Sequence, residues 1–109
     1  MPTIGHLPTL LVFACLALAG RAAHGAESFD NCTSFIDTIP AVISTQGVWC
    51  LRHNLSTSMT SGYAIRVMTN NVTIDCNDFK VGGLAAGNTS EAVGIRANDR
   101  QNITVRHCN

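Results

Sequence analysis

The chain nearly repeats itself at an interval of about 30 residues. Residues 64–67 (AIRV) return as residues 94–97 (GIRA) after 30 positions, and residues 71–74 (NVTI) return as residues 102–105 (NITV) after 31 positions. A unit this short cannot bury its own apolar face, so successive copies have to stack on one another. Because apolar and polar residues alternate within each copy, the repeat predicts an all-β solenoid.

Each copy is expected to supply three short strands to one coil of that solenoid. Within residues 63–67 the period-two alternation directs the apolar side chains inward and Arg66 outward. Residues 72–76 continue the pattern as a second strand, and residues 79–83 supply a third that ends at two glycines. The polar residues 85–91 then form a loop to the next coil. Stacking of the copies predicts that Ile65 lies over Ile95 and that Ile74 lies over Val105.

The segment before the repeat predicts shorter elements. Residues 41–43 and 48–51 indicate two short strands around a turn that contains Gly47. Residues 35–39 are expected to form a short helix that ends before Pro40, because a residue preceding proline avoids helical angles.

The N-terminus has the pattern of a secretory leader. Residues 7–19 form an apolar run that is too short to span a bilayer, and the small residues Ala23 and Gly25 offer a cleavage site. A lipid anchor at Cys15 is disfavoured because bulky Phe13 lies just before it. We therefore expect a secreted or periplasmic protein.

The predicted organisation has three parts. They are a signal peptide at 1–25, an N-terminal cap segment with the first strands at 26–52, and β-helix coils at 53–109 that are incomplete at the C-terminus.

The charge balance of the chain disfavours two classes of binding partner. Loss of the leader would remove Arg21 and leave six basic residues against seven acidic ones. A nearly neutral chain lacks the dense positive charge that nucleic acid or an anionic membrane requires, so neither is an expected partner.

In an oxidising compartment the four remaining cysteines are disulfide candidates, with three connectivities. We expect Cys32 to pair with Cys50, which ties the N-terminal segment to the first clear strand. Cys76 and Cys108 face opposite sides in the aligned register, so they stay reduced or pair through a bulge. The spacing is not that of a zinc site, and no metal or cofactor is expected.

Asparagines are placed where the coils turn. Asn71 and Asn102 occupy equivalent corners, where asparagine tolerates a positive φ and where stacked amides can form a hydrogen-bonded ladder. Asn-x-Ser/Thr sequons begin at Asn31, Asn54, Asn71, Asn88 and Asn102. Of these, Asn88 on its loop is expected to be the most accessible glycan acceptor, although corner ladders explain several of these asparagines without glycosylation.

Three stretches of the chain, residues 43–51 (ISTQGVWCL), 64–67 (AIRV) and 71–83 (NVTIDCNDFKVGG), carry a resemblance to a known family. With them, the chain from residue 43 to the C-terminus resembles the opening coils of secreted bacterial right-handed parallel β-helix proteins of the pectin-lyase-like superfamily. The resemblance implies a right-handed parallel β-helix, here an N-terminal cap and about two coils. The superfamily includes polysaccharide lyases, glycoside hydrolases and repeat proteins without assigned chemistry, so the fold does not decide the function.

No catalytic residue is identified by the sequence. Glycoside hydrolysis needs two carboxylates at a set separation, but the outward residue one coil from Asp75 is Arg106, which makes a structural ion pair. Asp78 and Asp99 fall at corners, where aspartate ordinarily caps a turn.

The arginine, histidine and tryptophan residues of the predicted strands can be explained by structural roles. Arg66 and Arg96 share one ladder, where they can contact an anion or an acidic sugar, or else splay apart in solvent. Strand alternation directs His107 inward, and Trp49 is expected to pack at the N-terminal end rather than to stack on a sugar. His53 has no thiol or carboxylate near it in sequence, so it is not expected to be a ligand.

The sequence is compatible with two alternative functions. The chain is expected to be an exported β-helix fragment with a structural role or a surface or carbohydrate-binding role. The alternative is the N-terminal part of a lyase or hydrolase acting on an acidic polysaccharide. In both cases the last strand exposes unpaired backbone groups, which oligomerisation or further coils have to cover.

Overall fold

The fold is all-β, and its strands lie in parallel sheets. The computed structural model describes residues 28–109, so the predicted signal peptide at 1–25 lies outside the described residues. The elements are β1 (Ser34–Phe35), β2 (Ala41–Ile43), β3 (Gly47–Cys50), β4 (Leu55–Ser56), β5 (Tyr63–Val67), β6 (Val72–Asp75), β7 (Val81–Gly82), the 3-10 helix η1 (Leu84–Ala86), β8 (Val93–Ala97) and β9 (Ile103–Arg106).

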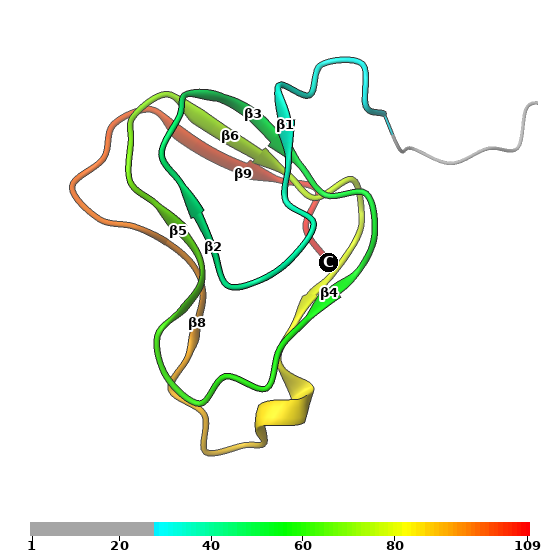
Figure 1. Ribbon diagram of the computed structural model, residues 1–109, viewed down its shortest axis with the longest axis vertical. Coiled ribbons are helices and arrows are strands. Elements are labelled where there is room, and N and C mark those ends of the chain that lie inside the picture. Colours follow the sequence, from blue (N-terminus) through cyan, green and yellow to red (C-terminus); the bar gives the residue numbers. More distant parts are fainter. Residues whose placement is uncertain (1–27) are drawn as a thin grey trace, which may run out of the picture.

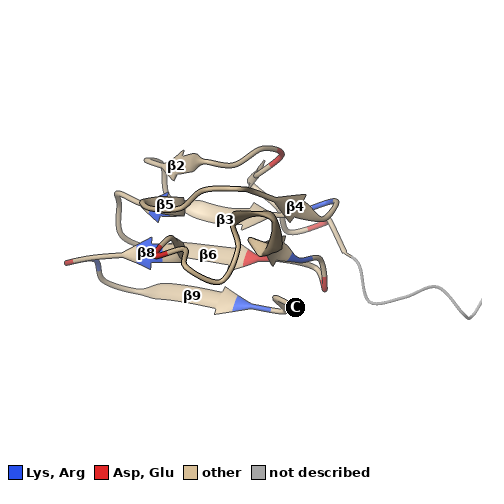
Figure 2. Ribbon diagram, turned by 90° about the horizontal axis from the view of Figure 1, so that it is seen from below, with Lys and Arg blue, Asp and Glu red and all other residues tan. Residues whose placement is uncertain are grey.

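The chain passes repeatedly through three parallel sheets. Their strand orders are β1-β3-β6-β9, β2-β5-β8 and β4-β7, and every pair is parallel. Viewed along the stacking direction, the chain traces a roughly three-sided path, and an edge-on view shows β2, β5 and β8 as successive layers (Figures 1 and 2). This arrangement is consistent with a β-helix-like fold.

The stacking register agrees with the sequence repeat. Ile65 pairs with Ile95 in the sheet of β5 and β8, and Ile74 pairs with Val105 in the sheet of β6 and β9. The change of offset from 30 to 31 residues falls in the corner between these sheets, because that corner spans 68–71 in one coil and 98–102 in the next. The additional residue therefore lengthens the corner and leaves the strands aligned.

Apolar side chains of the stacked strands fill the interior. The eight largest side chains that are almost completely buried are Ile43, Leu51, Ile65, Ile74, Val67, Val72, Cys50 and Cys76. Burial falls in the last coil, where Ile95 and Ile103 are half-buried and Val105 is 45% exposed. The core is thus formed mainly by the coils that precede β8 and β9 in the chain.

Two disulfides close the coils. Cys32 is joined to Cys50, the pair expected from the sequence, and Cys76 is joined to Cys108. Strand alternation alone would separate the second pair, but His107 adopts a left-handed φ of 54° just before Cys108. This single residue reverses the alternation, so the pairing does not require Cys108 to continue strand β9.

The N-terminal segment departs from the prediction at residues 35–39. Instead of a helix, residues 34–35 form strand β1, and the N–H of Ile36 donates to the carbonyl of Cys50. Pairing with the neighbouring strand satisfies more backbone groups than one helical turn would. The peptide bond between Ile39 and Pro40 is cis.

The connection before β8 also differs in detail from the polar loop that was predicted at 85–91. Its first residues form η1 (Leu84–Ala86), and Leu84 is 98% exposed. The rest of the segment is irregular and ends where the N–H of Glu91 donates to the carbonyl of Thr60.

Candidate functional site

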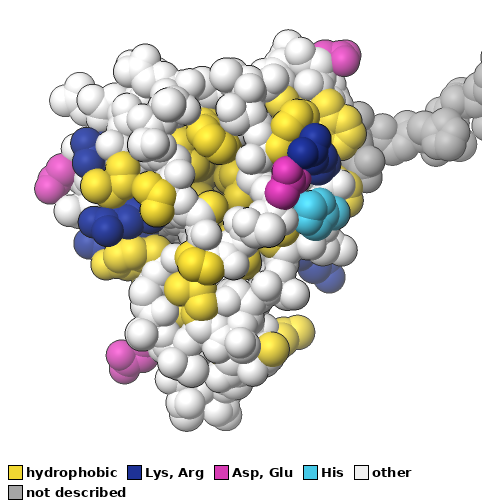
Figure 3. Space-filling model, in the orientation of Figure 1, with side chains coloured by type: hydrophobic (Ala, Val, Ile, Leu, Met, Phe, Trp, Pro, Cys, Tyr) yellow, Lys and Arg dark blue, Asp and Glu magenta, His cyan; other side chains and the backbone are white. Residues whose placement is uncertain are grey.

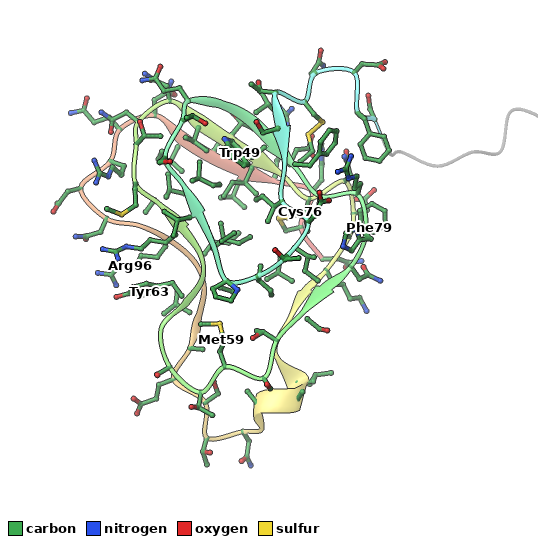
Figure 4. The ribbon with its side chains drawn as sticks, in the orientation of Figure 1. Trp49, Met59, Tyr63, Cys76, Phe79 and Arg96 are labelled. Carbon is green, nitrogen blue, oxygen red and sulfur yellow. A yellow bond between two sulfur atoms is a disulfide. The ribbon has the colours of Figure 1, made fainter. Side chains whose placement is uncertain are left out.

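Two arginines stack on the outer face of the sheet formed by β5 and β8. Arg66 and Arg96 are register partners, so their Cα atoms lie about one strand spacing, roughly 4.8 Å, apart. Both guanidinium groups contact the ring of Tyr63, with Cζ at 5.7 Å and 5.2 Å from the ring centroid. Tyr63 and Arg96 project from the same outer side of the molecule (Figure 4). The aromatic ring offsets part of the repulsion between the two like charges.

The long corner at 98–102 adds a third guanidinium. Arg66, Arg96 and Arg100 line one hollow of about 240 Å³ together with Tyr63, and we call this the arginine hollow. In the space-filling view, basic side chains gather at this edge of the molecule (Figure 3). Residues from two strands and a corner loop therefore face one space.

Arg100 is the unusual member of this group. Its Nε atom is buried and, within residues 28–109, has no hydrogen-bond partner. A buried N–H without an acceptor is costly, and such an atom in a folded protein calls for an explanation. Asp99 also lines the hollow, and its carboxylate accepts a hydrogen bond from Asn98 Nδ2 at 3.2 Å. The hollow thus holds three cationic groups and one anionic group.

A second polar cluster surrounds Asp75 on the sheet of β6 and β9. Asp75 Oδ2 accepts from Arg106 Nε at 3.0 Å, while Oδ1 accepts from the backbone N–H of Asn77 at 3.0 Å and lies 3.1 Å from His107 Nδ1. The ion pair between Asp75 and Arg106 was expected from the register, and the structure contains it. These contacts use both carboxylate oxygens in structural interactions.

The environment of Asp75 changes its acidity. Burial of the carboxyl group raises its pKa, but the hydrogen bonds from Asn77, His107 and Arg106 lower it. The lowering prevails, so the pKa of Asp75 lies below its ordinary value of 3.8. Asp75 is therefore ionised in neutral solution, which suits an ion pair and does not suit a general acid.

His107 does not lie in the interior, as strand alternation predicted. Its side chain is 61% exposed and its Nδ1 faces Asp75. The positive φ at this residue takes it out of the inward row that Ile103 and Val105 begin. The prediction failed because it assumed that the strand continues beyond Arg106, where β9 ends.

The corner asparagines lie where the repeat placed them. Asn71 and Asn102 each have a φ of 58°, and Asn102 Nδ2 donates to Asn71 Oδ1 at 3.0 Å. All five sequon asparagines are exposed, and Asn54 Oδ1 accepts from the N–H of Lys80. Three of the five sequon asparagines are therefore engaged in hydrogen bonds within the fold.

The remaining candidates have structural surroundings. Asp78 and Asp99 occupy corners with φ values of 65° and 55°. Trp49 packs against the core, and its Nε1 donates to the carbonyl of Thr45. His53 Nε2 lies 3.0 Å from the carbonyl oxygen of Asp37.

Residues 28–109 contain no group of three or more His, Cys, Asp or Glu side chains placed to hold a metal ion. In the same part of the chain, no helix has the length and apolar character needed to cross a bilayer.

The sequence predicted that Arg66 and Arg96 share one ladder, which the register confirms, but it gave no role to Arg100. The repeat identifies residues that stack, and Arg100 lies in the corner where the two copies differ in length. The change of offset between the two halves of the repeat was the available signal, because it marks the segment that leaves the common path.

Comparison with known protein families, curated proteins and solved structures found no match for this chain.

Proposed function

We propose that this protein is an exported parallel β-helix repeat protein that binds acidic carbohydrate at the arginine hollow. The observation that carries the proposal is the placement of Arg66 and Arg96, in register and both against Tyr63, on the lining of one hollow. Guanidinium groups form charge-assisted hydrogen bonds with carboxylates and with phosphate or sulfate groups. An aromatic ring beside them offers an apolar surface to a sugar.

Several features support the fold and location in this proposal. Parallel sheets that the chain visits in turn are compatible with the right-handed β-helix of the pectin-lyase-like superfamily. Two disulfides fit an oxidising compartment, in keeping with the leader-like sequence at 1–25. Since the Asp75 carboxylate is used by Arg106 and His107, a binding role is favoured over carbohydrate cleavage.

The test is affinity electrophoresis of the folded protein through gels containing polygalacturonate or an uncharged glucan. We expect retardation in polygalacturonate alone, and less retardation at higher salt because the contact is electrostatic. The double variant R66A/R96A should lose the retardation. K80A is the matched control, since Lys80 is exposed and is not among the residues that line the arginine hollow.

Two results would contradict the proposal. Equal mobility in the two gels would remove the carbohydrate-binding role. Release of unsaturated sugar ends from polygalacturonate, with or without calcium, would replace binding by the alternative of a carbohydrate-active enzyme.

A further inference from the structure

The arginine hollow has more guanidinium groups than a single carboxylate can bind. A carboxylate has two oxygens in one plane, and one guanidinium fork satisfies both in a bidentate pair. Arg66 and Arg96 come from adjacent strands and Arg100 comes from a corner loop, so the three side chains enter the hollow from three backbone positions. A sulfate or phosphate ester is tetrahedral, and its three free oxygens point in different directions. These oxygens can accept hydrogen bonds from all three guanidinium groups.

We infer that the arginine hollow selects a tetrahedral oxyanion ester, a sulfate or phosphate group on a polysaccharide, and that Arg100 is the residue that makes this selection. The inference rests on the proposed function and names the acidic group that the same site prefers. Arg100 supplies the guanidinium that a carboxylate leaves without an acceptor.

The state of Arg100 supports this assignment. Its buried Nε has no hydrogen-bond partner among residues 28–109, so no acceptor in this part of the chain holds the guanidinium through that atom. The Asp99 carboxylate on the same corner accepts from Asn98 Nδ2 and lowers the net charge of the lining from three to two. The residual positive charge of the lining favours an anion over an uncharged sugar.

The corner itself explains how Arg100 reaches the hollow. The equivalent corner one coil above spans 68–71 and is one residue shorter. In the longer corner, Asp99 takes a φ of 55° and Asn102 resumes the ladder with Asn71. The loop is therefore closed at its end by the ladder, and this closure holds Arg100 beside the arginine row of β5 and β8.

Two dextrans with the same backbone provide the test, one carrying sulfate esters and the other carboxymethyl groups at equal charge density. We expect the wild-type protein to bind dextran sulfate about tenfold more tightly than carboxymethyl dextran at one salt concentration. R100A should lose most of that preference while keeping its affinity for carboxymethyl dextran. R100K keeps the charge but not the planar fork, so it should recover little of the preference. K80A again controls for the loss of one charge.

Competition with small anions identifies the ester. Displacement of dextran sulfate by inorganic sulfate or phosphate, but not by acetate at equal ionic strength, supports a tetrahedral group. The more effective of the two competitors shows whether that group is a sulfate or a phosphate. Acetate displacing the polymer as well as either of them would overturn the inference.

Failure of this inference can be told apart from failure of the proposed function. Equal binding of the two dextrans, with R100A weakening both to the same extent, would overturn the selection and leave acidic carbohydrate binding in place. Binding of neither dextran, with polygalacturonate also unbound, would overturn both. Near-ultraviolet circular dichroism of each variant checks that the fold is retained.

Discussion

Asp75 joins the coil of β6 to the last coil through one carboxylate. It accepts from Arg106 and from the N–H of Asn77 and contacts His107, and its pKa is lowered from 3.8. A carboxyl group with a lowered pKa stabilises the folded state above the pKa of the unfolded chain, and this contribution is lost as the pH falls through the folded value. The contribution of Asp75 is therefore complete at neutral pH and decreases below about pH 4.

We predict that D75N lowers the free energy of unfolding at pH 7 by about 1–2 kcal/mol, because charge-assisted hydrogen bonds are replaced by weaker ones. At pH 3 the difference from the wild type should shrink, since the wild-type carboxyl group approaches protonation there. Urea unfolding at the two pH values measures both effects. D37N is the control: Asp37 pairs with Arg52 on the surface, where ion pairs contribute little. A D75N difference that is unchanged at pH 3 would contradict the argument.

The corner ladder separates two roles of asparagine. At Asn102 the φ of 58° disfavours residues with a Cβ, and the side chain donates to Asn71. We predict that N102G loses only the hydrogen bond, while N102A also pays for the left-handed backbone, about 1–2 kcal/mol more. Thermal unfolding of the two variants gives the comparison. N102A equal to or more stable than N102G would show that the corner backbone relaxes.

Residue-level prediction worked where the repeat holds and failed where it ends. The facing of Arg66 and Arg96 follows from alternation within aligned strands. His107 directly follows β9, and Arg100 lies in the corner between β8 and β9. A left-handed backbone at His107 and a lengthened corner at Arg100 set the direction of the chain there. Neither feature recurs along the sequence, so the repeat does not predict it.

At the scale of the strands, burial increases from the last coil toward the middle one. Ile65 is fully buried between β2 and β8, whereas its partner Ile95 is only half-buried. Two isoleucines at equivalent places in the repeat therefore differ in how many layers cover them.

We predict that I65A lowers the free energy of unfolding by about 2–5 kcal/mol, and that I95A lowers it by about half as much or less. The first substitution leaves a cavity between two layers, and the second removes a side chain that is covered on one side. Denaturant unfolding of both variants measures the difference. Equal losses would indicate that another layer covers β8 in solution.

Strand β1, near which the sequence predicted a helix at residues 35–39, shows the limit of local signals. Residues 34–35 pair with Trp49 and Cys50, which lie 15 positions further along the chain. A helix at this place would satisfy its backbone locally, but an adjacent strand edge offers the same bonds together with burial of Ile36. Local pattern alone could not weigh a partner that distant in sequence.

For the molecule as a whole, the disulfides limit how far the coils can separate on unfolding. Cys76 and Cys108 are 32 residues apart and link adjacent coils, while Cys32 and Cys50 are 18 residues apart. In the chain-entropy description, the longer loop confers more stability.

We predict that C76A/C108A lowers the free energy of unfolding by about 3–4 kcal/mol. Thermal unfolding of this variant and of C32A/C50A, each under non-reducing conditions, orders the two bonds. A smaller loss for C76A/C108A than for C32A/C50A would show that native contacts, rather than loop closure, dominate the effect.

The overall architecture was accessible because one pattern, the near repeat, specifies both strand direction and register. The apolar residues of β8 and β9 are half-buried or exposed, including Val93 and Val105.

The contact of Tyr63 with Arg66 and Arg96 has an optical consequence. The chain has one tyrosine and one tryptophan, and the tryptophan packs against the core at the carbonyl of Thr45. Under the proposed function, ultraviolet difference absorption of the phenol would report on a ligand in the arginine hollow, while indole fluorescence reports separately on whether the coils are folded. The wild-type protein carries two native chromophores, one for each event, and needs no attached dye.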